Sequence, residues 1–319
     1  MRKAALLYNP DSGGSGKVRL AELNSALAVL RNAGVAADLI PTESRDHAGV
    51  ATRQAIASGC DTIFACGGDG TIHNIAQVLA KSAVTLAILP MGTANALAHD
   101  IGLPMSVTEA VQAALQAAPR RIALGRVQYT NPQGVPGSCY FVVAAGVGVD
   151  AHLFYKLHSG TKQRMGMTAY YAKAARLWFT YAMPRFTAEY LETGADTLKR
   201  AQVTELMGVR IRNFGGVVQE LAPGASLDRD DMRLVLCRTA SRFAYLGYVA
   251  RCLLRLNWTI PGIELAHSKQ VSCSYQSPAA PEGQPRIYIE ADGELLGTLP
   301  AEISVVPDAL SLLAPTRST

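Results

Sequence analysis

Residues 62–71 read TIFACGGDGT, an apolar run that ends in a turn containing three glycines, an aspartate and a threonine. The apolar part predicts a buried strand, and helical periodicity begins near Ile72. A strand that leads into a glycine-rich turn and a helix lets backbone N–H groups approach a phosphate, beside the positive end of the helix dipole. A tight turn alone would account for one or two glycines. We therefore interpret Gly67–Thr71 as a phosphate-binding loop.

Short strands and helices alternate on both sides of this loop, from residue 1 to about residue 124. The apolar periodicity predicts strands over 3–8, 36–40, 62–66 and 85–89 and helices over 18–32, 47–58 and 72–81. This alternation predicts a mostly parallel sheet with helices on both faces, in which ligands bind at the carboxyl ends of the strands. We expect a first domain over 1–124 that also takes in about 307–319.

The pattern changes after residue 124 to strand-like runs separated by turn clusters. Strands are predicted over 125–129, 139–149, 203–213, 232–238, 286–290 and 302–306, with helix-period stretches over about 165–183 and 242–256. This favours an antiparallel β domain over 125–306.

Composition narrows the class of protein. The chain has 319 residues, a formal net charge of +5, 49% hydrophobic residues and 17% charged residues. Such a chain can bury a large core, which excludes disorder and coiled coil, and its mild charge does not indicate a nucleic-acid binder. The six cysteines include no Cys-x-x-Cys pair and are predicted to be reduced core thiols. No signal peptide or spanning helix is expected, so we predict a cytoplasmic protein.

Two further loops follow predicted strands, at residues 9–17 (NPDSGGSGK) and 90–98 (PMGTANALA). The first resembles a Walker phosphate loop but has Asp11 where the motif needs glycine and Val18 where it needs serine or threonine. A Walker-type nucleotide triphosphatase is therefore excluded.

Residues 146–151 form a weak Gly-x-Gly-x-x-Ala dinucleotide pattern. No acidic residue follows about twenty residues later, so the nicotinamide interpretation fails.

The ordered motifs resemble one family along nearly the whole chain. They are Asn9-Pro10 with Ser12-Gly13-Gly14, then Gly67–Thr71, then Gly92-Thr93-Ala94-Asn95, and finally Asp292-Gly293-Glu294. Together they resemble the catalytic-domain family of diacylglycerol, sphingosine and ceramide kinases and their soluble bacterial relatives. The resemblance implies an N-terminal α/β nucleotide-binding domain like that of NAD kinases and phosphofructokinases. It also implies a C-terminal β-sandwich lipid-binding domain, with ATP bound between the two.

The resemblance also implies roles for single residues. Glu294 matches the family's general base, and Asp292 matches the acidic residue that organises Mg²⁺ together with Asp69. Asp150 matches a carboxylate that faces the acceptor in sphingosine kinases. The implied nucleotide-binding residues are Asn9, Ser12, Gly13, Thr42, Gly67, Gly68, Asp69, Gly70, Thr71, Gly92, Thr93 and Asn95.

A second Mg²⁺ site, of structural type, is implied at residues 227–232. Asp230 would supply a carboxylate, and Leu227 and Met232 would supply backbone carbonyls. Oxygen ligands suit this ion, although an acidic β-turn is the commoner reason for such a run.

The sequence departs from the diacylglycerol kinase branch at several positions. Ala96 follows Asn95 where many bacterial members have aspartate, and Ala123 replaces a second expected carboxylate. His73-Asn74 replaces the commoner Asn-Glu. These changes leave open a catalytically weak lipid-binding or regulatory protein on the same scaffold.

Two segments combine arginine or lysine with aromatic residues, at 151–190 and 241–266. Both suit docking on anionic headgroups, and both also fit helices that bury their aromatics in the protein core. We expect an ATP- and Mg²⁺-dependent lipid kinase that associates peripherally with the membrane and phosphorylates diacylglycerol, a sphingoid base, ceramide or a related alcohol. NAD kinase is the less favoured enzymatic alternative, and a homodimer is left open.

Overall fold

The computed structural model describes residues 1–10, 16–43, 45–131, 133–156, 176–216, 219–256, 258–275 and 286–315. The chain divides into two compact units. Unit 1 comprises Met1–Leu124, Asn213–Gln219 and Val306–Thr319, and unit 2 comprises Gly125–Arg212 and Glu220–Val305. The short segment Asn213–Gln219, which the sequence pattern assigns to the second domain, lies within unit 1.

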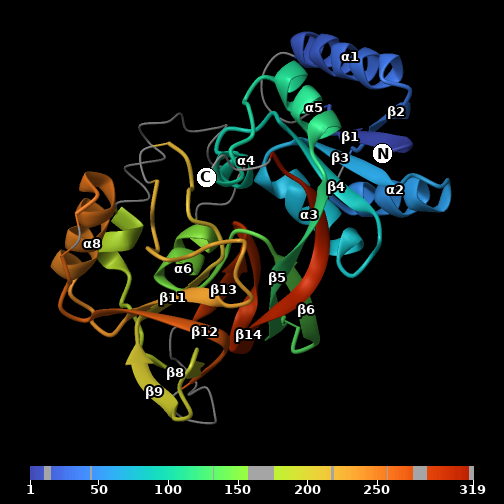
Figure 1. The fold of residues 1–319 in the computed structure, drawn as a ribbon. Helices are drawn as coiled ribbons and strands as arrows, with labels where there is room; N and C mark the ends of the chain where they lie inside the picture. Colours follow the sequence, from blue (N-terminus) through green and yellow to red (C-terminus); the bar gives the residue numbers. More distant parts are fainter. Residues whose placement is uncertain are drawn as a thin grey trace. The chain divides into compact units, whose positions relative to one another are not determined.

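Unit 1 is an α/β layer structure (Figure 1). Its strands are β1 (Lys3–Tyr8), β2 (Ala36–Pro41), β3 (Thr62–Gly67), β4 (Thr85–Pro90) and the end of β14 (Glu294–Leu313). They lie in the order β2-β1-β3-β4-β14, and every neighbouring pair is parallel. All residues of β3 and β4 are buried, as expected for strands that helices cover on both faces.

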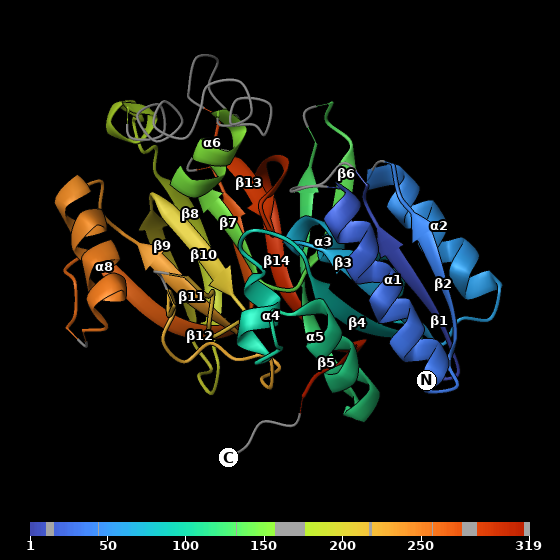
Figure 2. The ribbon, with the colours of Figure 1, turned by 90° about the horizontal axis from the view of Figure 1, so that it is seen from above.

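The helices of unit 1 cover both faces of this sheet (Figure 2). They are α1 (Gly16–Asn32), α2 (Arg45–Ala57), α3 (Asp69–Leu79), α4 (Ala96–Asp100) and α5 (Val107–Gln116). α1 packs beside α5, and α2 packs beside α3. This arrangement leaves the carboxyl ends of the strands to the loops, as the sequence pattern predicts.

Unit 2 is built from antiparallel strands. They are β5 (Pro119–Thr130), which begins in unit 1, β6 (Pro136–Phe141), β7 (Ala144–Gly148), β8 (Phe186–Glu192), β9 (Leu198–Val203), β10 (Glu205–Val209), β11 (Met232–Cys237), β12 (Ile263–Ser274), β13 (Tyr288–Ala291) and β14. The order β14-β13-β7-β10-β11-β12 closes on itself, because β12 also pairs with β14. Its interior holds a continuous core that includes Phe141, Phe186 and Ile303. The predicted fold class, an α/β domain followed by a β-sandwich domain, is confirmed.

Unit 2 also differs from the predicted element pattern. The apolar run 139–149 forms two strands, β6 and β7, separated at residues 142–143. The strands β8, β9 and β12 were not predicted: the alternation in β8 covers only five residues, and β9 and β12 mix polar and apolar residues irregularly. Two helices, α6 (Val149–Lys156) and α8 (Arg242–Leu254), flank these strands (Figure 2).

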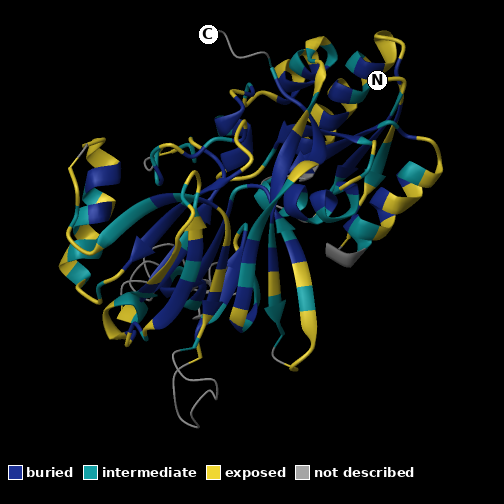
Figure 3. Ribbon diagram, turned by 60° about the horizontal axis from the view of Figure 1, so that its bottom comes forward, coloured by how far each residue is buried: buried dark blue, intermediate teal, exposed yellow. Residues whose placement is uncertain are grey.

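Burial agrees with the expectations from composition. Figure 3 shows the buried strands of both units and the exposed outer faces of the helices. All six cysteines are buried free thiols, as predicted. Among the described residues, no helix combines the length and the apolar character that crossing a membrane requires.

Candidate functional site

Two glycine-containing loops of unit 1 touch at the carboxyl ends of β3 and β4. A Cβ atom placed on Gly92 would lie 2.4 Å from the Cα of Gly68, so only glycine permits this approach of the two backbones. The Met91 N–H donates to the Gly67 carbonyl at 3.1 Å, which continues the strand pairing into the loops. The phosphate loop and the Gly92–Asn95 loop therefore form one surface.

Asn95 fixes the shape of the second loop. Its Oδ1 accepts from the Gly92 N–H at 2.9 Å, and its Nδ2 donates to the Gly92 carbonyl at 3.0 Å. The residue is buried and adopts φ 49°, a left-handed conformation that asparagine tolerates better than most residues. Gly92 and Thr93 remain exposed. Asn95 thus holds the loop closed, while its neighbours face outward.

Asp69 lies in the first turn of α3, directly after the phosphate loop. Its Oδ1 accepts from the Leu97 N–H at 3.4 Å, which ties this helix to α4. The N-cap residue Gly68 offers no side chain, and the first amide bonded back to its carbonyl is that of Thr71, at 2.9 Å. The first turn of a helix directs its backbone amides outward along the helix axis, which is the arrangement that binds phosphate oxygens.

The remaining predicted nucleotide residues occupy the ends of β1 and β2. Thr42 is buried, and both its N–H and its Oγ1 donate to the Tyr8 carbonyl, at 2.7 and 3.1 Å. The Asn9 carbonyl accepts from Arg19 Nη1 at 3.3 Å. Ser12 and Gly13 lie outside the described residues. In this structure Thr42 fastens two strand ends together.

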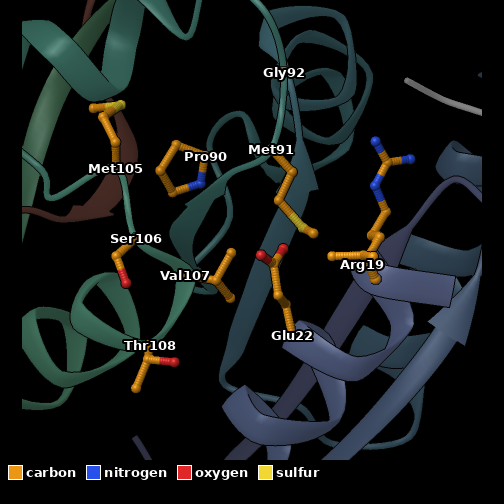
Figure 4. Close-up of a pocket in the computed structure, with 10 residues that line it drawn as sticks. Arg19, Glu22, Pro90, Met91, Gly92, Met105, Ser106, Val107 and Thr108 are labelled. Atoms are coloured by element: carbon orange, nitrogen blue, oxygen red, sulfur yellow. The ribbon is translucent and has the colours of Figure 1, made fainter. Parts of the chain in front are cut away.

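A pocket of about 450 Å³ opens beside Gly92 (Figure 4). It is lined by Val18, Arg19 and Glu22 of α1, by Pro90, Met91 and Gly92, and by Met105, Ser106, Val107 and Thr108 at the start of α5. The Glu22 carboxylate points toward Met91, and the volume is in the range of small-molecule sites. The motifs gave no sign of this pocket, because its residues come from three separate elements.

The segment Asn213–Gln219 packs against α4. The Asn213 N–H donates to Asp100 Oδ1 at 2.9 Å, and Asn213 Nδ2 donates to the His99 carbonyl at 3.5 Å. A Cβ on Gly215 would lie 2.2 Å from Cδ2 of His99. A distant segment therefore helps to hold the helix that follows the Gly92–Asn95 loop.

In unit 2, the Asp292-Gly293 pair forms the two-residue turn of the β13–β14 hairpin. Both residues have positive φ, which suits this turn type, and Ala291 pairs with Glu294. The Asp292 carboxylate accepts three backbone N–H groups: Val142 at 2.9 Å, Val143 at 2.8 Å and Ala144 at 3.2 Å. It therefore fastens the hairpin to the break between β6 and β7, and explains why the predicted strand 139–149 is interrupted.

Glu294, the first residue of β14, is half-buried. The Gly293 N–H before it donates to the buried Glu290 carboxylate at 2.7 Å. Two carboxylates, on Glu290 and Asp292, thus hold the hairpin backbone on either side of the turn. The hairpin is a rigid support for the Glu294 side chain.

A second pair of carboxylates, Asp150 and Glu205, lies at the start of α6. Glu205 accepts from the N–H groups of Val149 and Asp150, and Asp150 Oδ1 accepts from the Ala151 N–H at 2.5 Å. A Cβ on Gly146 would lie 1.9 Å from Asp150 Oδ2. The glycines that resemble a dinucleotide motif therefore make room for this carboxylate.

Burial raises the pKa of Asp150, and it raises the pKa of Glu205 well above its ordinary value, with the neighbouring Asp150 adding to the effect. Two neighbouring buried carboxylates disfavour each other's ionisation, so both pKa values shift upward. Glu205 Oε1 and the Tyr181 hydroxyl are both buried without a hydrogen-bond partner in the described part of the chain. The sequence gave no sign of Glu205, since it stands alone at the start of β10.

An apolar cluster adjoins this pair. Val149, Tyr181 and Met183 form its buried part, and Trp178 and Tyr245 pack against it. Tyr245 is held by a hydrogen bond between its hydroxyl and Thr204 Oγ1, at 2.9 Å. The Asp150–Glu205 pair is thus bordered by aromatic and aliphatic side chains.

The acidic turn at 227–232 encloses the buried side chain of Arg210, which directly follows β10. Arg210 Nη1 donates to the carbonyls of Arg229, at 2.7 Å, and Asp231, and burial lowers the pKa of Arg210 to about 10. Asp230 is exposed. A guanidinium already supplies positive charge inside this turn, so the residues present do not favour a second cation there. Magnesium ligation by Leu227, Asp230 and Met232 stays a prediction from the resemblance.

Within the described residues, no group of three or more His, Cys, Asp or Glu side chains could hold a metal ion. Any Mg²⁺ bound through Asp69 or Asp292 would therefore be held mainly through water and nucleotide phosphates, which is usual for this ion. The Asp292 carboxylate already accepts three N–H groups, so only its remaining oxygen lone pairs are available to Mg²⁺ or its water ligands.

Comparison with known protein families decides the assignment. Residues 3–127 match the diacylglycerol kinase catalytic domain, and residues 142–314 match the YegS C-terminal NAD kinase beta sandwich-like domain. The chain belongs to this diacylglycerol kinase family. The predicted family and enzyme class, a lipid kinase, are confirmed. Ala96 and Ala123, at the two positions where the resemblance led us to expect carboxylates, are both buried.

Named relatives span nearly the whole chain. The diacylglycerol kinase of Bacillus subtilis (strain 168) is 26% identical over 305 residues, which are 95% of this chain and 93% of that protein. The diacylglycerol kinase of Staphylococcus aureus (strain bovine RF122 / ET3-1) is 24% identical over 317 residues, covering 98% and 93%.

Solved structures share the fold. A crystal structure of a protein described as a putative diacylglycerol kinase from Bacillus anthracis str. Sterne has a TM-score of 0.74 and 18% identity, covering 98% of this chain and 97% of that one. Yeast NADH kinase in complex with NADH has a TM-score of 0.52 and 10% identity, covering 99% and 84%.

Proposed function

We propose that this lipid kinase transfers the terminal phosphoryl group of ATP, with Mg²⁺, to a hydroxyl of a long-chain acceptor. The observation that carries the proposal is the contact between the Gly67–Thr71 and Gly92–Asn95 loops at the carboxyl edge of a parallel sheet. Diacylglycerol is the first acceptor to test, because the named relatives are diacylglycerol kinases.

Unit 1 would bind the nucleotide. The amides of Asp69 and Gly70 at the start of α3 would donate to phosphate oxygens, and exposed Thr93 would border the same surface. The pocket beside Gly92 would receive the nucleoside, since the Glu22 carboxylate repels phosphate but accepts hydrogen bonds from ribose hydroxyls or an amino group.

Unit 2 would bind and activate the acceptor. Glu294 would accept the proton of the attacking hydroxyl, and Asp292 would hold the hairpin that carries it. Bound Mg²⁺-ATP would supply the phosphoryl group and neutralise its charge, with Asp69 and Asp292 as the carboxylates assigned to the ion. Little covalent help from the protein is needed in such a reaction, so positioning is the main task of these residues.

A sphingoid base is the second candidate acceptor. The Asp150–Glu205 pair would keep a negative charge after taking up one proton, and among the described residues Glu205 Oε1 and the Tyr181 hydroxyl have no hydrogen-bond partner. An ammonium group with a neighbouring hydroxyl could satisfy both. The adjoining aromatic cluster would then contact the first carbons of the chain.

The test is transfer of labelled phosphate from ATP to diacylglycerol, ceramide or a sphingoid base in detergent micelles, with NAD as a further acceptor. We expect a phosphorylated lipid, and we expect Mg²⁺-ATP to stabilise the fold by ~2.7 kcal/mol at a hundredfold excess over its Kd. Asp69→Ala should lose both effects. Asp38→Ala, which changes an exposed aspartate on β2, is the matched control and should lose neither.

Three results would contradict the proposal in different ways. Phosphorylation of NAD instead of lipid would favour an NAD kinase. Lipid binding without transfer would favour a regulatory protein on the kinase scaffold. Absence of any stabilisation by adenine nucleotides would remove the assignment of the glycine loops to ATP.

A further inference from the structure

Helix α8 exposes a row of large apolar side chains. Phe243 is 86% exposed, and the row continues at spacings of three and four residues, so its members share one helical face. The row consists of Phe243, Leu246, Val249, Leu253 and Leu254, and it extends beyond the helix to Leu256 and Trp258. Figure 3 shows exposed stretches along this helix, at the left edge of the view. Scattered surface leucines are ordinary, but a contiguous row of this length is not.

The opposite face of α8 is buried and carries polar groups. The Tyr248 hydroxyl donates to the Leu221 carbonyl at 2.6 Å, and the Arg251 guanidinium lies over the Tyr248 ring at 5.4 Å. Cys252 Sγ also donates to Leu221, at 3.8 Å. A surface helix usually buries its apolar face and exposes its polar one. α8 buries Tyr248 and Cys252 but leaves its longest row of large apolar side chains exposed, which indicates that its outer face meets surroundings other than water.

Contacts at its first turn fix the direction in which this row points. Arg242 Nη2 donates to the Tyr181 carbonyl at 2.9 Å, and the Tyr245 hydroxyl bonds to Thr204. The helix therefore cannot rotate to bury Phe243 and Leu246 without breaking several hydrogen bonds to unit 2.

The charge around the row identifies the occupant. Between Asp231 and Glu264 the sequence contains no acidic residue and five arginines, Arg233, Arg238, Arg242, Arg251 and Arg255. Arg255, at the end of the helix, is exposed beside Leu254 and Leu256. Arg251 is buried on the opposite face, and Arg238 pairs with Glu264. The charge next to the row therefore comes from Arg255 and the half-buried Arg242. An apolar row with these two arginines at its ends and an exposed tryptophan has the composition of a helix that lies in the interface of an anionic bilayer.

A second copy of the chain fits this face less well. A two-fold interface would place the arginine-rich segment against itself, and the segment has no acidic residue to neutralise it. We propose that α8 is an interfacial docking helix, whose apolar row from Phe243 to Trp258 inserts into the headgroup region of an anionic lipid bilayer. The proposal rests on the proposed function, because it gives the kinase access to an acceptor held in that bilayer. In the other basic and aromatic segment, 151–190, residues 157–175 lie outside the described residues.

Sedimentation of the full chain with phosphatidylcholine vesicles, with and without phosphatidylglycerol, tests the proposal. We expect binding that requires phosphatidylglycerol and weakens with salt. The double change Phe243→Ser and Leu254→Ser should reduce partitioning by more than about tenfold, since it removes two apolar side chains from the inserted row. Val135→Ser with Leu198→Ser, at two exposed apolar positions outside α8, is the matched control and should bind as the wild type does.

Fluorescence supplies a second readout in which the apolar row of α8 is left unchanged. The chain has two tryptophans, so Trp178→Phe leaves Trp258 as the only reporter. We expect a blue shift on anionic vesicles and quenching by brominated lipid. Unchanged emission of Trp258, with the protein bound to the vesicles, would overturn the assignment of α8.

Measurements of turnover and of oligomeric state distinguish membrane docking from the other possible roles of this face. The Phe243→Ser and Leu254→Ser variant should retain turnover on detergent-dispersed acceptor and lose it on vesicles. If the wild type ignored anionic vesicles, or if the variant changed from dimer to monomer in analytical ultracentrifugation without losing vesicle binding, the docking proposal would fail. Vesicle binding without lipid phosphorylation in any medium would instead contradict the proposed function and leave the docking role standing.

Discussion

The glycine loops of unit 1 and the carboxylates of unit 2 build their sites by opposite means. In unit 1 the loops bring backbone against backbone, and Gly68 and Gly92 are needed because a Cβ would fill the space. In unit 2 the hairpin and the start of α6 are held by side-chain carboxylates that accept backbone N–H groups. A site built from close backbone contacts can be recognised in the sequence by its glycines. A site built from side-chain carboxylates cannot, because its residues come from distant segments of the chain.

The largest expected effect is on turnover, and it distinguishes the roles of two neighbouring carboxylates of unit 2, Glu294 and Asp292. Glu294→Gln keeps the size of the side chain but cannot accept a proton, so turnover should fall by about 10²–10⁴-fold with Mg²⁺-ATP affinity nearly unchanged. Asp292→Asn should instead lower the melting temperature, because its amide cannot accept all three N–H groups, at a cost of about 1–3 kcal/mol.

Steady-state kinetics and thermal unfolding of both variants give the comparison. A Glu294→Gln enzyme with more than about a tenth of the wild-type turnover would show that this residue is not the base. Equal loss of stability in both variants would mean that Glu294 also serves the hairpin.

The second prediction concerns the contact between the glycine loops. Gly92→Ala places a Cβ 2.4 Å from Gly68 Cα, so the loops must separate, and we expect nucleotide binding to weaken by about 1–3 kcal/mol. Calorimetry with Mg²⁺-ATP measures the change. Gly49→Ala is the control: its Cβ would meet Arg53 of α2 and Val78 of α3 at ordinary contact distances, and alanine favours a helix. Unaltered nucleotide affinity in Gly92→Ala would show that the nucleotide does not use this surface.

The smallest expected effect tests the Asp150–Glu205 pair through pH. Burial raises the pKa of Glu205, so its contribution to stability is complete below the ordinary glutamate pKa of 4.5 and is lost as pH rises through the folded value. Glu205→Gln removes this dependence and can still accept from the Val149 and Asp150 amides. The variant should therefore gain stability relative to wild type as pH rises above 4.5, by about 1.4 kcal/mol for each unit of raised pKa.

Thermal unfolding from pH 4.5 upward measures this difference, with Glu302→Gln on β14 as the control for loss of a carboxylate. A constant difference across the range would show that Glu205 ionises as freely in the folded chain as in the unfolded one. Addition of a sphingoid base should raise the melting temperature of the wild type more than that of Glu205→Gln if the pair binds a cationic acceptor.

Sequence alone determined the parallel sheet of unit 1 and the positions of its phosphate loops. The strands β1, β3 and β4 are short apolar runs that end in glycine, asparagine or proline, and this local pattern needs no tertiary information. The Asp292-Gly293 turn was equally visible, because this dipeptide is a strong hairpin signal. In these regions the same short stretch of sequence predicts both the local structure and the candidate functional residues.

Only the tertiary structure decided how the other groups are used. Glu205, the Glu22 pocket and the contact of Asn213 with Asp100 join residues far apart in the chain, and no local periodicity records such contacts. The outer face of α8 is a further case: its apolar residues are periodic, but periodicity does not say which face is buried. The hydrogen bonds from Tyr248 to the Leu221 carbonyl and from Arg242 to the Tyr181 carbonyl settle that question, because they fix which face of the helix packs against unit 2.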